Sequence, residues 1–287
     1  MPAETHLYNM PTDKSAVDLA SVWLDERRIE DNWSSIYDHV YHDVQYCYRL
    51  YKERVADLVQ SAWKERGGRV LEVGCGTGAV LATLAHRGIP QSQLSGVDIS
   101  PLMVAEAQAK LPGAGFAAVP FEQFEPSQPY ECVYFCGALH HLADKRIVAE
   151  RLNAIMPPGA ALLVCEPNGQ WMFSRLFWKR AVRLVTPVWM FWRLVNHRRV
   201  VELAKKQEGK GDPAFHEHIT ASDIEQAFNP YFELIGSHTS FAITRLHEGV
   251  VLDPGLTVKF LGILDTIANV IAPQRGGSIH MTFRKRR

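Results

Sequence analysis

A short apolar run followed at once by three closely spaced glycines constrains the fold more than any other feature of this sequence. Val70–Val73 has the length and composition of a buried strand, Gly74, Gly76 and Gly78 follow it, and an apolar helical pattern begins at Ala79. Glycine lets the backbone turn tightly and approach a ligand closely, and the following helix offers free N–H groups at its N-terminus. The segment therefore predicts a ligand-binding turn between a strand and a helix of an open α/β sheet.

The sequence after this turn alternates between apolar runs of strand length and longer runs of helical periodicity. Strands are predicted over 94–97, 115–119, 131–136 and 160–165, and helices over 79–87, 101–110 and 144–155. This alternation is typical of βαβ units with right-handed crossovers and a parallel sheet. Two later strands, 232–237 and 278–283, complete the predicted fold, a doubly wound, mostly parallel, seven-stranded α/β sheet.

Four regions follow from these patterns. We expect an N-terminal helical cap over 1–64, an α/β core over 65–168, an aromatic and basic helical insert over 169–219, and the rest of the core over 220–287. The last region contains a further helix at about 256–271 and a helix over 221–228. In the cap, two helical segments are predicted between Ala16 and Lys64, the second with an apolar face that runs from Trp33 to Leu58.

Composition excludes several classes of protein. The 31 basic and 31 acidic residues balance, so no global field favours nucleic acid as a partner. The five cysteines show no spacing typical of a metal site, and the N-terminal segment lacks the layout of a signal peptide. From the cysteine spacing we expect no bound metal. Because no apolar run is long enough to span a bilayer, we expect a soluble cytoplasmic protein.

Asp98 strengthens the interpretation of the glycine turn. It ends the second predicted strand, 22 residues after Gly76. A carboxylate at this place can accept hydrogen bonds from both hydroxyls of a ribose. Together the turn and Asp98 predict a nucleoside site. Gly74, Gly76 and Ala79 also satisfy the dinucleotide pattern, so these residues leave both NAD and another adenosine cofactor open.

Four motifs in order resemble those of class I S-adenosylmethionine-dependent methyltransferases. They are the glycine turn with Glu72 before it, GVDISPLMV at 96–104, YECVYFCGALHHL at 130–142 and RLNAIMPPGAALLVCEP at 151–167. The resemblance covers about residues 68–168 and implies an enzyme that uses S-adenosylmethionine rather than NAD.

The resemblance also implies roles for individual residues. The methionine moiety would lie on the turn, the ribose on Asp98, the adenine between Phe121 and the pair Ile99 and Met103, and the sulfonium beside Cys136. The turn residues in question are Glu72, Gly74, Cys75, Gly76 and Gly78. The family often has an acidic residue near the end of the third strand, where this chain has Ala118–Glu122. Either Glu122 or backbone groups would then recognise the adenine amino group.

Several polar side chains are candidates for catalysis or substrate binding. Methyl transfer needs a general base only when the acceptor must lose a proton. His141, and less strongly His140, stand where such a base would act, although histidines at this place often have no catalytic role in the family. Glu166 either faces the acceptor or caps a helix. Candidates for the substrate pocket are Tyr37, Tyr41, Trp171, Trp178 and His218, of which the tyrosines could equally pack in the core.

The aromatic and basic insert suggests the kind of acceptor. Trp171 to Leu203 holds four of the seven tryptophans and many Lys and Arg residues. It is either a lid over an apolar pocket, a membrane-surface element over 171–200, or a helical cap with a purely structural role. We expect a bulky hydrophobic acceptor, such as a prenyl, lipid, quinone or polyketide-like molecule. The alternatives are a cofactor-binding protein without transfer activity and a methyltransferase acting on RNA or a small polar metabolite, although no RNA-binding module accompanies the basic residues.

Overall fold

The computed structural model describes residues 19–34, 37–38, 46–171, 219–242 and 256–287. In these residues a seven-stranded sheet has the strand order β3-β2-β1-β4-β5-β7-β6. The strands are β1 (Val70–Val73), β2 (Leu94–Asp98), β3 (Gly115–Ala118), β4 (Cys132–Cys136), β5 (Ala161–Pro167), β6 (Phe232–Ser240) and β7 (Ser278–Lys285). Strands β1 to β5 pair in parallel, and β7 pairs antiparallel with both β5 and β6. The predicted doubly wound, mostly parallel sheet is confirmed.

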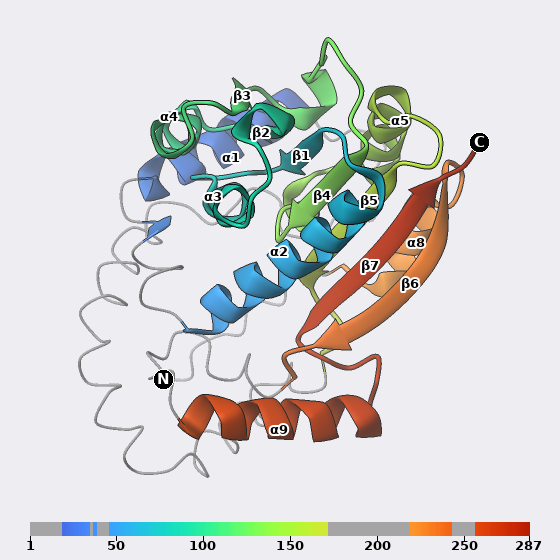
Figure 1. Cartoon of the computed structure of the whole chain (residues 1–287). Coiled ribbons are helices and arrows are strands. Elements are labelled where there is room, and N and C mark those ends of the chain that lie inside the picture. The colour runs from blue at the N-terminus through green and yellow to red at the C-terminus, as the bar shows by residue number, and fades with distance from the viewer. Residues whose placement is uncertain (1–18, 35–36, 39–45, 172–218, 243–255) are drawn as a thin grey trace, which may run out of the picture.

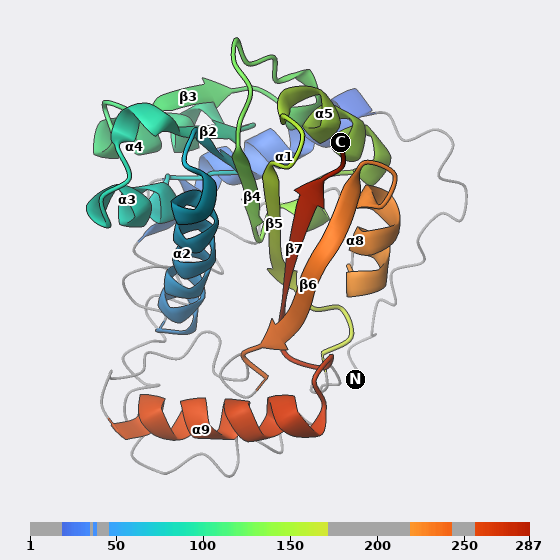
Figure 2. The ribbon, with the colours of Figure 1, turned by 45° about the vertical axis from the view of Figure 1, so that its right-hand side comes forward.

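Helices cover both faces of the sheet. One face carries α2 (Tyr46–Arg66) and α3 (Ala79–His86), and the other carries α5 (Lys145–Ile155) and α8 (Ala221–Phe228). Figure 1 shows α2 lying along the first face, and Figure 2 shows α8 behind β6 on the second. Strands with helices on both faces are buried on both sides, which explains why they are continuous apolar runs.

Local signals in the sequence set where several helices begin. The hydroxyl of Ser100 accepts the N–H of Met103 at the start of α4 (Pro101–Lys110), with proline in the first turn. Asp144 accepts the N–H groups of Arg146 and Ile147 at the start of α5. At α8, a capping box joins Thr220 and Asp223. Such caps satisfy N–H groups that have no partner inside the helix.

The N-terminal helices differ from their predicted bounds. The first, α1, spans Leu19–Trp33, and α2 begins at Tyr46. Trp33 therefore ends the first helix and does not belong to the apolar face of the second, as its spacing had suggested. Periodicity alone misled because aromatic and β-branched residues at intervals of three and four continue through the chain between the two helices.

A last helix lies apart from the two layers. Helix α9 spans Leu256–Ile271, the predicted range, and lies beyond the end of the β6–β7 hairpin in both views (Figures 1 and 2). The Thr239 hydroxyl donates to the carbonyl of Pro273, and the Asn168 amide donates to that of Gly276. These bonds place the chain after α9 at the edge of the sheet where β5 ends. Of the helices described, none is long and apolar enough to cross a membrane.

Candidate functional site

A pocket of about 890 Å³, part of it open to solvent, lies at the carboxyl ends of β1, β2 and β4. Strand order reverses between β1 and β4, and crevices at such reversals are where open α/β sheets bind ligands. Its lining comes from the chain after each of these strands, from the turn after β3, and from α1. The lining residues used below are Trp23, Glu26, Glu30, Tyr37, Gly74, Gly76, Asp98, Ile99, Phe121, Glu122, Cys136, Gly137 and His141.

The glycine turn after β1 is shaped by backbone conformations that favour glycine. Gly74 has φ +68°, and a Cβ there would stand 2.4 Å from the Cβ of Ala138. Gly76 has φ +49°, and nothing lies within 4 Å of the place where its Cβ would be. Gly74 thus permits close packing between two turns, whereas Gly76 leaves open space beside exposed backbone. That combination suits a ligand that rests directly on the chain.

Asp98 at the end of β2 holds the turn and also faces the pocket. Its Oδ2 accepts the N–H of Gly76 at 2.8 Å, and its Oδ1 accepts the N–H of Ser100 at 2.9 Å. Burial raises the pKa of this carboxyl despite those hydrogen bonds. Since a carboxylate has about four lone-pair sites, two remain for the hydroxyls of a bound ribose.

The turn after β4 is held by a buried carboxylate. Glu166 Oε1 accepts the N–H groups of Ala138 at 2.9 Å and Leu139 at 2.7 Å, and its Oε2 lies 2.6 Å from Nδ1 of His140. Glu166 therefore caps the short helix η5 (Leu139–His141) instead of lining the pocket. Burial lowers the pKa of His140 even though Glu166 opposes that effect. His140 is a structural partner of Glu166 in this arrangement.

His141, whose ring lies 4.1 Å from that of His140 between centroids, lines the pocket. Its Nδ1 lies 3.6 Å from Oε2 of Glu26 on α1. Burial disfavours the imidazolium, but the carboxylates of Glu26, Glu30 and Glu166 outweigh burial and raise the pKa of His141. The charged form of His141 is thus stabilised by the acidic residues around it.

Helix α1 contributes pocket residues that the sequence analysis missed. Trp23, Glu26 and Glu30 recur at spacings of three and four, which places them on one face of the helix. Burial, and then the neighbouring Asp98, raises the pKa of Glu30 to about 7. The signal that could have identified them is this row of an aromatic and two acidic residues on one face of the first predicted helical segment, for which the sequence analysis named no site residue.

The pocket end formed by the turn after β3 is lined by the aromatic ring of Phe121 and the carboxyl group of Glu122. Phe121 is buried, packs edge-on against Phe135 with ring centroids 6.2 Å apart, and lines the pocket together with Ile99. Glu122 lies in the pocket beside them, and burial raises the pKa of its carboxyl although the Trp23 indole favours the charged form. Ring faces and a carboxyl group at one end match what an adenine with its amino group requires.

Other residues assigned to the cofactor lie near the pocket without lining it. Glu72 is buried beneath the turn beside Tyr134, and burial raises the pKa of Glu72 to about 8. Cys75 packs toward Gly96, and Met103 is buried in the core side of α4. A Cβ at Gly78 would stand 3.0 Å from that of Ala107, so the absence of a side chain at Gly78 allows the start of α3 to pack closely against α4.

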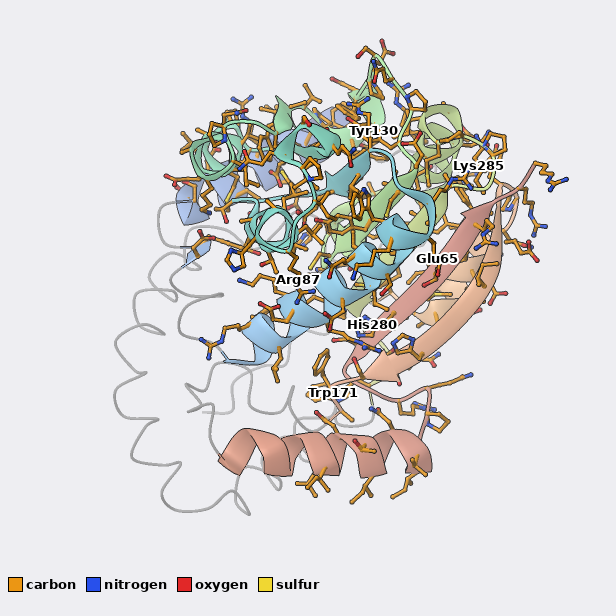
Figure 3. All side chains as sticks on the ribbon, in the orientation of Figure 1. Glu65, Arg87, Tyr130, Trp171, His280 and Lys285 are labelled. Carbon is orange, nitrogen blue, oxygen red and sulfur yellow. The ribbon has the colours of Figure 1, made fainter. Side chains whose placement is uncertain are left out.

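Of the residues predicted for the substrate pocket, one lines the pocket and one lies elsewhere in the described structure. Tyr37 lines the pocket. Trp171 is buried elsewhere, at the end of the sheet near α9, where its indole N–H donates to the carbonyl of Ala242 at 2.9 Å (Figure 3). Tyr41, Trp178 and His218 lie outside the described residues. In the part of the chain that the structure describes, no group of three or more His, Cys, Asp or Glu side chains is arranged to hold a metal ion.

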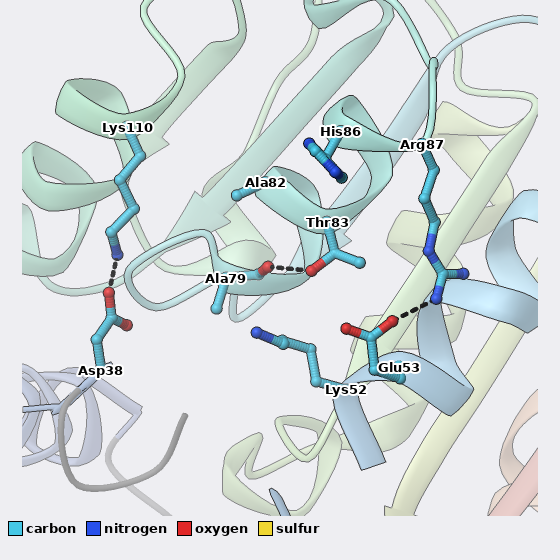
Figure 4. Close-up of a pocket in the computed structure, with 9 residues that line it drawn as sticks. All are labelled: Asp38, Lys52, Glu53, Ala79, Ala82, Thr83, His86, Arg87 and Lys110. Carbon is cyan, nitrogen blue, oxygen red and sulfur yellow. Dashed lines mark hydrogen bonds and ion pairs between the residues drawn. The ribbon is translucent and has the colours of Figure 1, made fainter. Parts of the chain in front are cut away.

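A second hollow lies between α2, α3, the end of α4 and Asp38 (Figure 4). Its charged groups are largely paired with one another. Lys110 pairs with Asp38, and Arg87 pairs with Glu53 and with Asp57, the latter at 2.7 Å. Asp38 also accepts the hydroxyl of Thr77, beside the glycine turn. The contacts of Asp38 therefore connect the N-terminal segment to the glycine turn. Among the described residues, the lining of this hollow has neither the aromatic ring nor the glycine backbone that line the first pocket.

Comparison with known proteins agrees with this geometry. A sequence model of the family described as "Methyltransferase domain" matches residues 45–229, more than half of the chain. Trans-aconitate 2-methyltransferase of Escherichia fergusonii is 31% identical over 103 residues, which are 36% of this chain and 40% of that protein. The corresponding Yersinia pseudotuberculosis enzyme is 34% identical over 99 residues, 34% of this chain and 38% of that protein. The chain thus spans about two fifths of the length of the curated relatives it matches.

Similarity to solved structures extends over most of the chain. Magnesium protoporphyrin IX methyltransferase from Synechocystis, solved with bound S-adenosylhomocysteine, has a TM-score of 0.53 and 14% identity, covering 92% of this chain and 100% of that one. The [4+2]-cyclase SpnF has a TM-score of 0.52 and 17% identity, covering 81% of each chain. At these identities the likeness shows a shared fold.

Proposed function

This chain belongs to the methyltransferase-domain family, among the class I S-adenosylmethionine-dependent methyltransferases, and we propose that it transfers the methyl group of S-adenosylmethionine to a hydrophobic small molecule. One observation carries the transfer reaction. The glycine turn, Asp98 and the Cys136–Gly137 turn, which come from three different strands, line a single pocket. In the proposed complex, each of the three would contact a different part of the cofactor.

Several features of the pocket support S-adenosylmethionine as its ligand. Nothing lies within 4 Å of where a Cβ would stand on Gly76 or Gly137, so a ligand can rest against the backbone at both turns. Asp98 retains acceptor sites for the ribose hydroxyls, and Phe121 offers a ring face for adenine. Glu26 brings a buried carboxylate toward a ligand that carries a positive charge.

When bound, S-adenosylmethionine supplies an electrophilic methyl carbon, and the acceptor atom forms its bond to this carbon as the carbon–sulfur bond breaks. Alignment and exclusion of water can supply most of the acceleration of such a displacement. The Cys136–Gly137 turn, held by Glu166, would border the reacting centre. Tyr37 would close the same side of the pocket.

His141 is the residue that would take a proton from an acceptor that has to lose one. The neighbouring carboxylates raise the pKa of His141, which strengthens its affinity for a proton released by the acceptor. Glu26 is the carboxylate in contact with it, at 3.6 Å. His140, bound to Glu166, would keep the turn in position and take no part in proton transfer.

The hydrophobic acceptor is supported by α9. Ile263, Ile267, Val270 and Ile271 recur along one side of this helix and are between 50% and 78% exposed. The helix lies at the edge of the sheet where β5 ends, the same edge as the pocket. Exposed aliphatic side chains in a row are typical of surfaces that bind apolar molecules. The relatives' name favours a second candidate acceptor, a small polar acid.

An acceptor panel tests the proposal. We would measure transfer of a labelled methyl group to prenylated phenols, quinols, fatty acids and trans-aconitate, using the wild type, Ile267→Glu, and Leu102→Glu on α4 as the matched control. We expect turnover of apolar acceptors and a KM that rises about tenfold in Ile267→Glu only, as loss of one apolar contact predicts. Turnover of trans-aconitate alone would reject the hydrophobic acceptor. Binding of S-adenosylmethionine without any transfer would favour a cofactor-binding protein that has another role.

A further inference from the structure

The side of the pocket formed by α1 is acidic. Glu26 and Glu30 lie one turn apart on the helical face that lines the pocket. Opposite them stands Asp98 at the end of β2, and Glu122 lies at the aromatic end. Among the lining residues that the structure describes, His141 is the one basic side chain. Four carboxyl groups therefore surround a space to which a single imidazole contributes positive charge.

The carboxylate of Glu26 is only partly paired within the described residues. The residue is 6% exposed, and its Oε1 atom is buried without a hydrogen-bond partner among the described residues. Its other oxygen is 3.6 Å from Nδ1 of His141. An ionised carboxylate with a buried, unpartnered oxygen is costly to keep, so the site is suited to a ligand that brings positive charge.

Glu30 lies in the same acidic surroundings, one turn of α1 from Glu26. The groups that face it are Glu26 and Asp31 on α1, Asp98 from β2, and His141 from η5. Of these, only His141 lowers the pKa of Glu30, and burial and the three carboxyls raise it. A cation that enters the pocket would reverse this balance and stabilise the ionised form of Glu30.

We propose that α1 forms part of the methyl-donor site, and that Glu26 and Glu30 supply the counter-charge that makes the pocket bind S-adenosylmethionine more tightly than S-adenosylhomocysteine. The inference rests on the proposed cofactor. Donor and product share adenosine and the amino acid end, and differ by one methyl group and the charge on sulfur. A neutral pocket would hold them alike, whereas buried carboxylates favour the sulfonium. Transfer itself would then weaken the hold on the product and help its release.

Calorimetric titration of the full chain tests this. The ligands are S-adenosylmethionine, S-adenosylhomocysteine and an analogue in which a carbon atom bearing a primary amine replaces the methylated sulfonium centre. The proteins are the wild type, Glu26→Gln, Glu30→Gln, and Asp25→Asn as the control. Asp25 is an exposed carboxylate of α1 with Arg28 3.6 Å away. Glutamine keeps the size of glutamate, and melting temperatures would report whether each variant is folded.

At pH 8 we expect the wild type to bind the donor and the amine analogue roughly tenfold more tightly than the product, the size of a single partly screened charge interaction. Glu26→Gln and Glu30→Gln should each reduce that ratio about threefold or more, with product affinity nearly unchanged, and Asp25→Asn should not. Equal binding of donor and product, or a ratio that survives both substitutions in folded protein, overturns the inference and leaves the cofactor in place. Failure of all three nucleosides to bind would overturn the inference and the proposed function together.

Discussion

Nδ1 of His140 lies 2.6 Å from Oε2 of Glu166, and Oε1 of Glu166 binds two backbone N–H groups of the turn that borders the pocket. One buried carboxylate at the end of β5 thus holds the chain that leaves β4. Neither side chain lines the pocket, yet the position of Gly137 and His141 depends on both. Residues that line the pocket are thus distinct from the buried pair that holds them in position.

Removing this carboxylate should destabilise the fold and the turn together. Glu166→Ala leaves two backbone donors and the His140 ring without their acceptor in a buried place, so we expect a loss of about 3–5 kcal/mol in the free energy of unfolding. Glu166→Gln keeps one acceptor oxygen and should lose less. Urea unfolding followed by circular dichroism measures both. Equal stability of Glu166→Ala and the wild type would contradict the assigned role.

Two glycines with similar backbone conformations should respond differently to alanine. Gly67 ends α2 with φ +70°, Gly76 has φ +49°, and a Cβ would meet nothing within 4 Å at either position. Alanine should cost each about 1–2 kcal/mol of stability through backbone strain. Gly76→Ala should also weaken binding of S-adenosylmethionine roughly tenfold or more by filling the space beside the turn, whereas Gly67→Ala should not. Titration of both variants distinguishes ligand contact from strain.

Asp98 holds the glycine turn, and in the proposed site it would also bind the ribose. Asp98→Asn keeps the size of the side chain and one acceptor oxygen, but replaces the other oxygen by a donor that would face the N–H of Gly76 or Ser100. We expect a rise in the Kd for S-adenosylhomocysteine of about 30- to 100-fold, or roughly 2–3 kcal/mol, because charged hydrogen bonds are lost. Asp57→Asn on the exposed side of α2 is the control. Unchanged affinity in Asp98→Asn would mean that the ribose lies elsewhere.

Stability without ligand should depend on pH through Glu30. Its pKa is raised from 4.5 to about 7 in the folded chain, so the folded state binds the proton more tightly than the unfolded state. The stabilising effect of this proton is complete below the unfolded pKa and is lost as the pH rises to about 7. Between pH 5 and 8 Glu30 should account for a fall of up to about 3 kcal/mol in unfolding free energy.

The comparison of wild type with Glu30→Gln isolates this contribution. Glutamine does not titrate, so the difference in unfolding free energy between the two proteins should change with pH in the absence of ligand and change less with saturating S-adenosylmethionine, which favours the ionised carboxylate. Thermal or urea unfolding at pH 5, 6, 7 and 8 provides the measurement. Parallel curves for the two proteins at every pH would show that Glu30 titrates normally.

Much of the fold was predictable because its signals are local. The bounds of α4, α8 and α9 agree with the sequence prediction, since proline, capping residues and apolar periodicity act within one or two turns of helix. The strand, glycine turn and helix at 70–86, and the carboxylate of Asp98 at a strand end, were recognisable for the same reason. A parallel sheet then brings the carboxyl ends of its neighbouring strands to one edge.

What the sequence by itself determined was therefore the order of elements, the nucleoside-binding turn and the family. Only the tertiary structure decided which face of α1 covers the pocket, that Glu166 reaches the turn after β4, and that Glu72 turns away toward Tyr134. Those relationships join residues 28 to 115 positions apart, such as Ala138 with Glu166 and Glu26 with His141. Local periodicity contains no information about such pairs, because packing of whole elements against the sheet sets the distance between them.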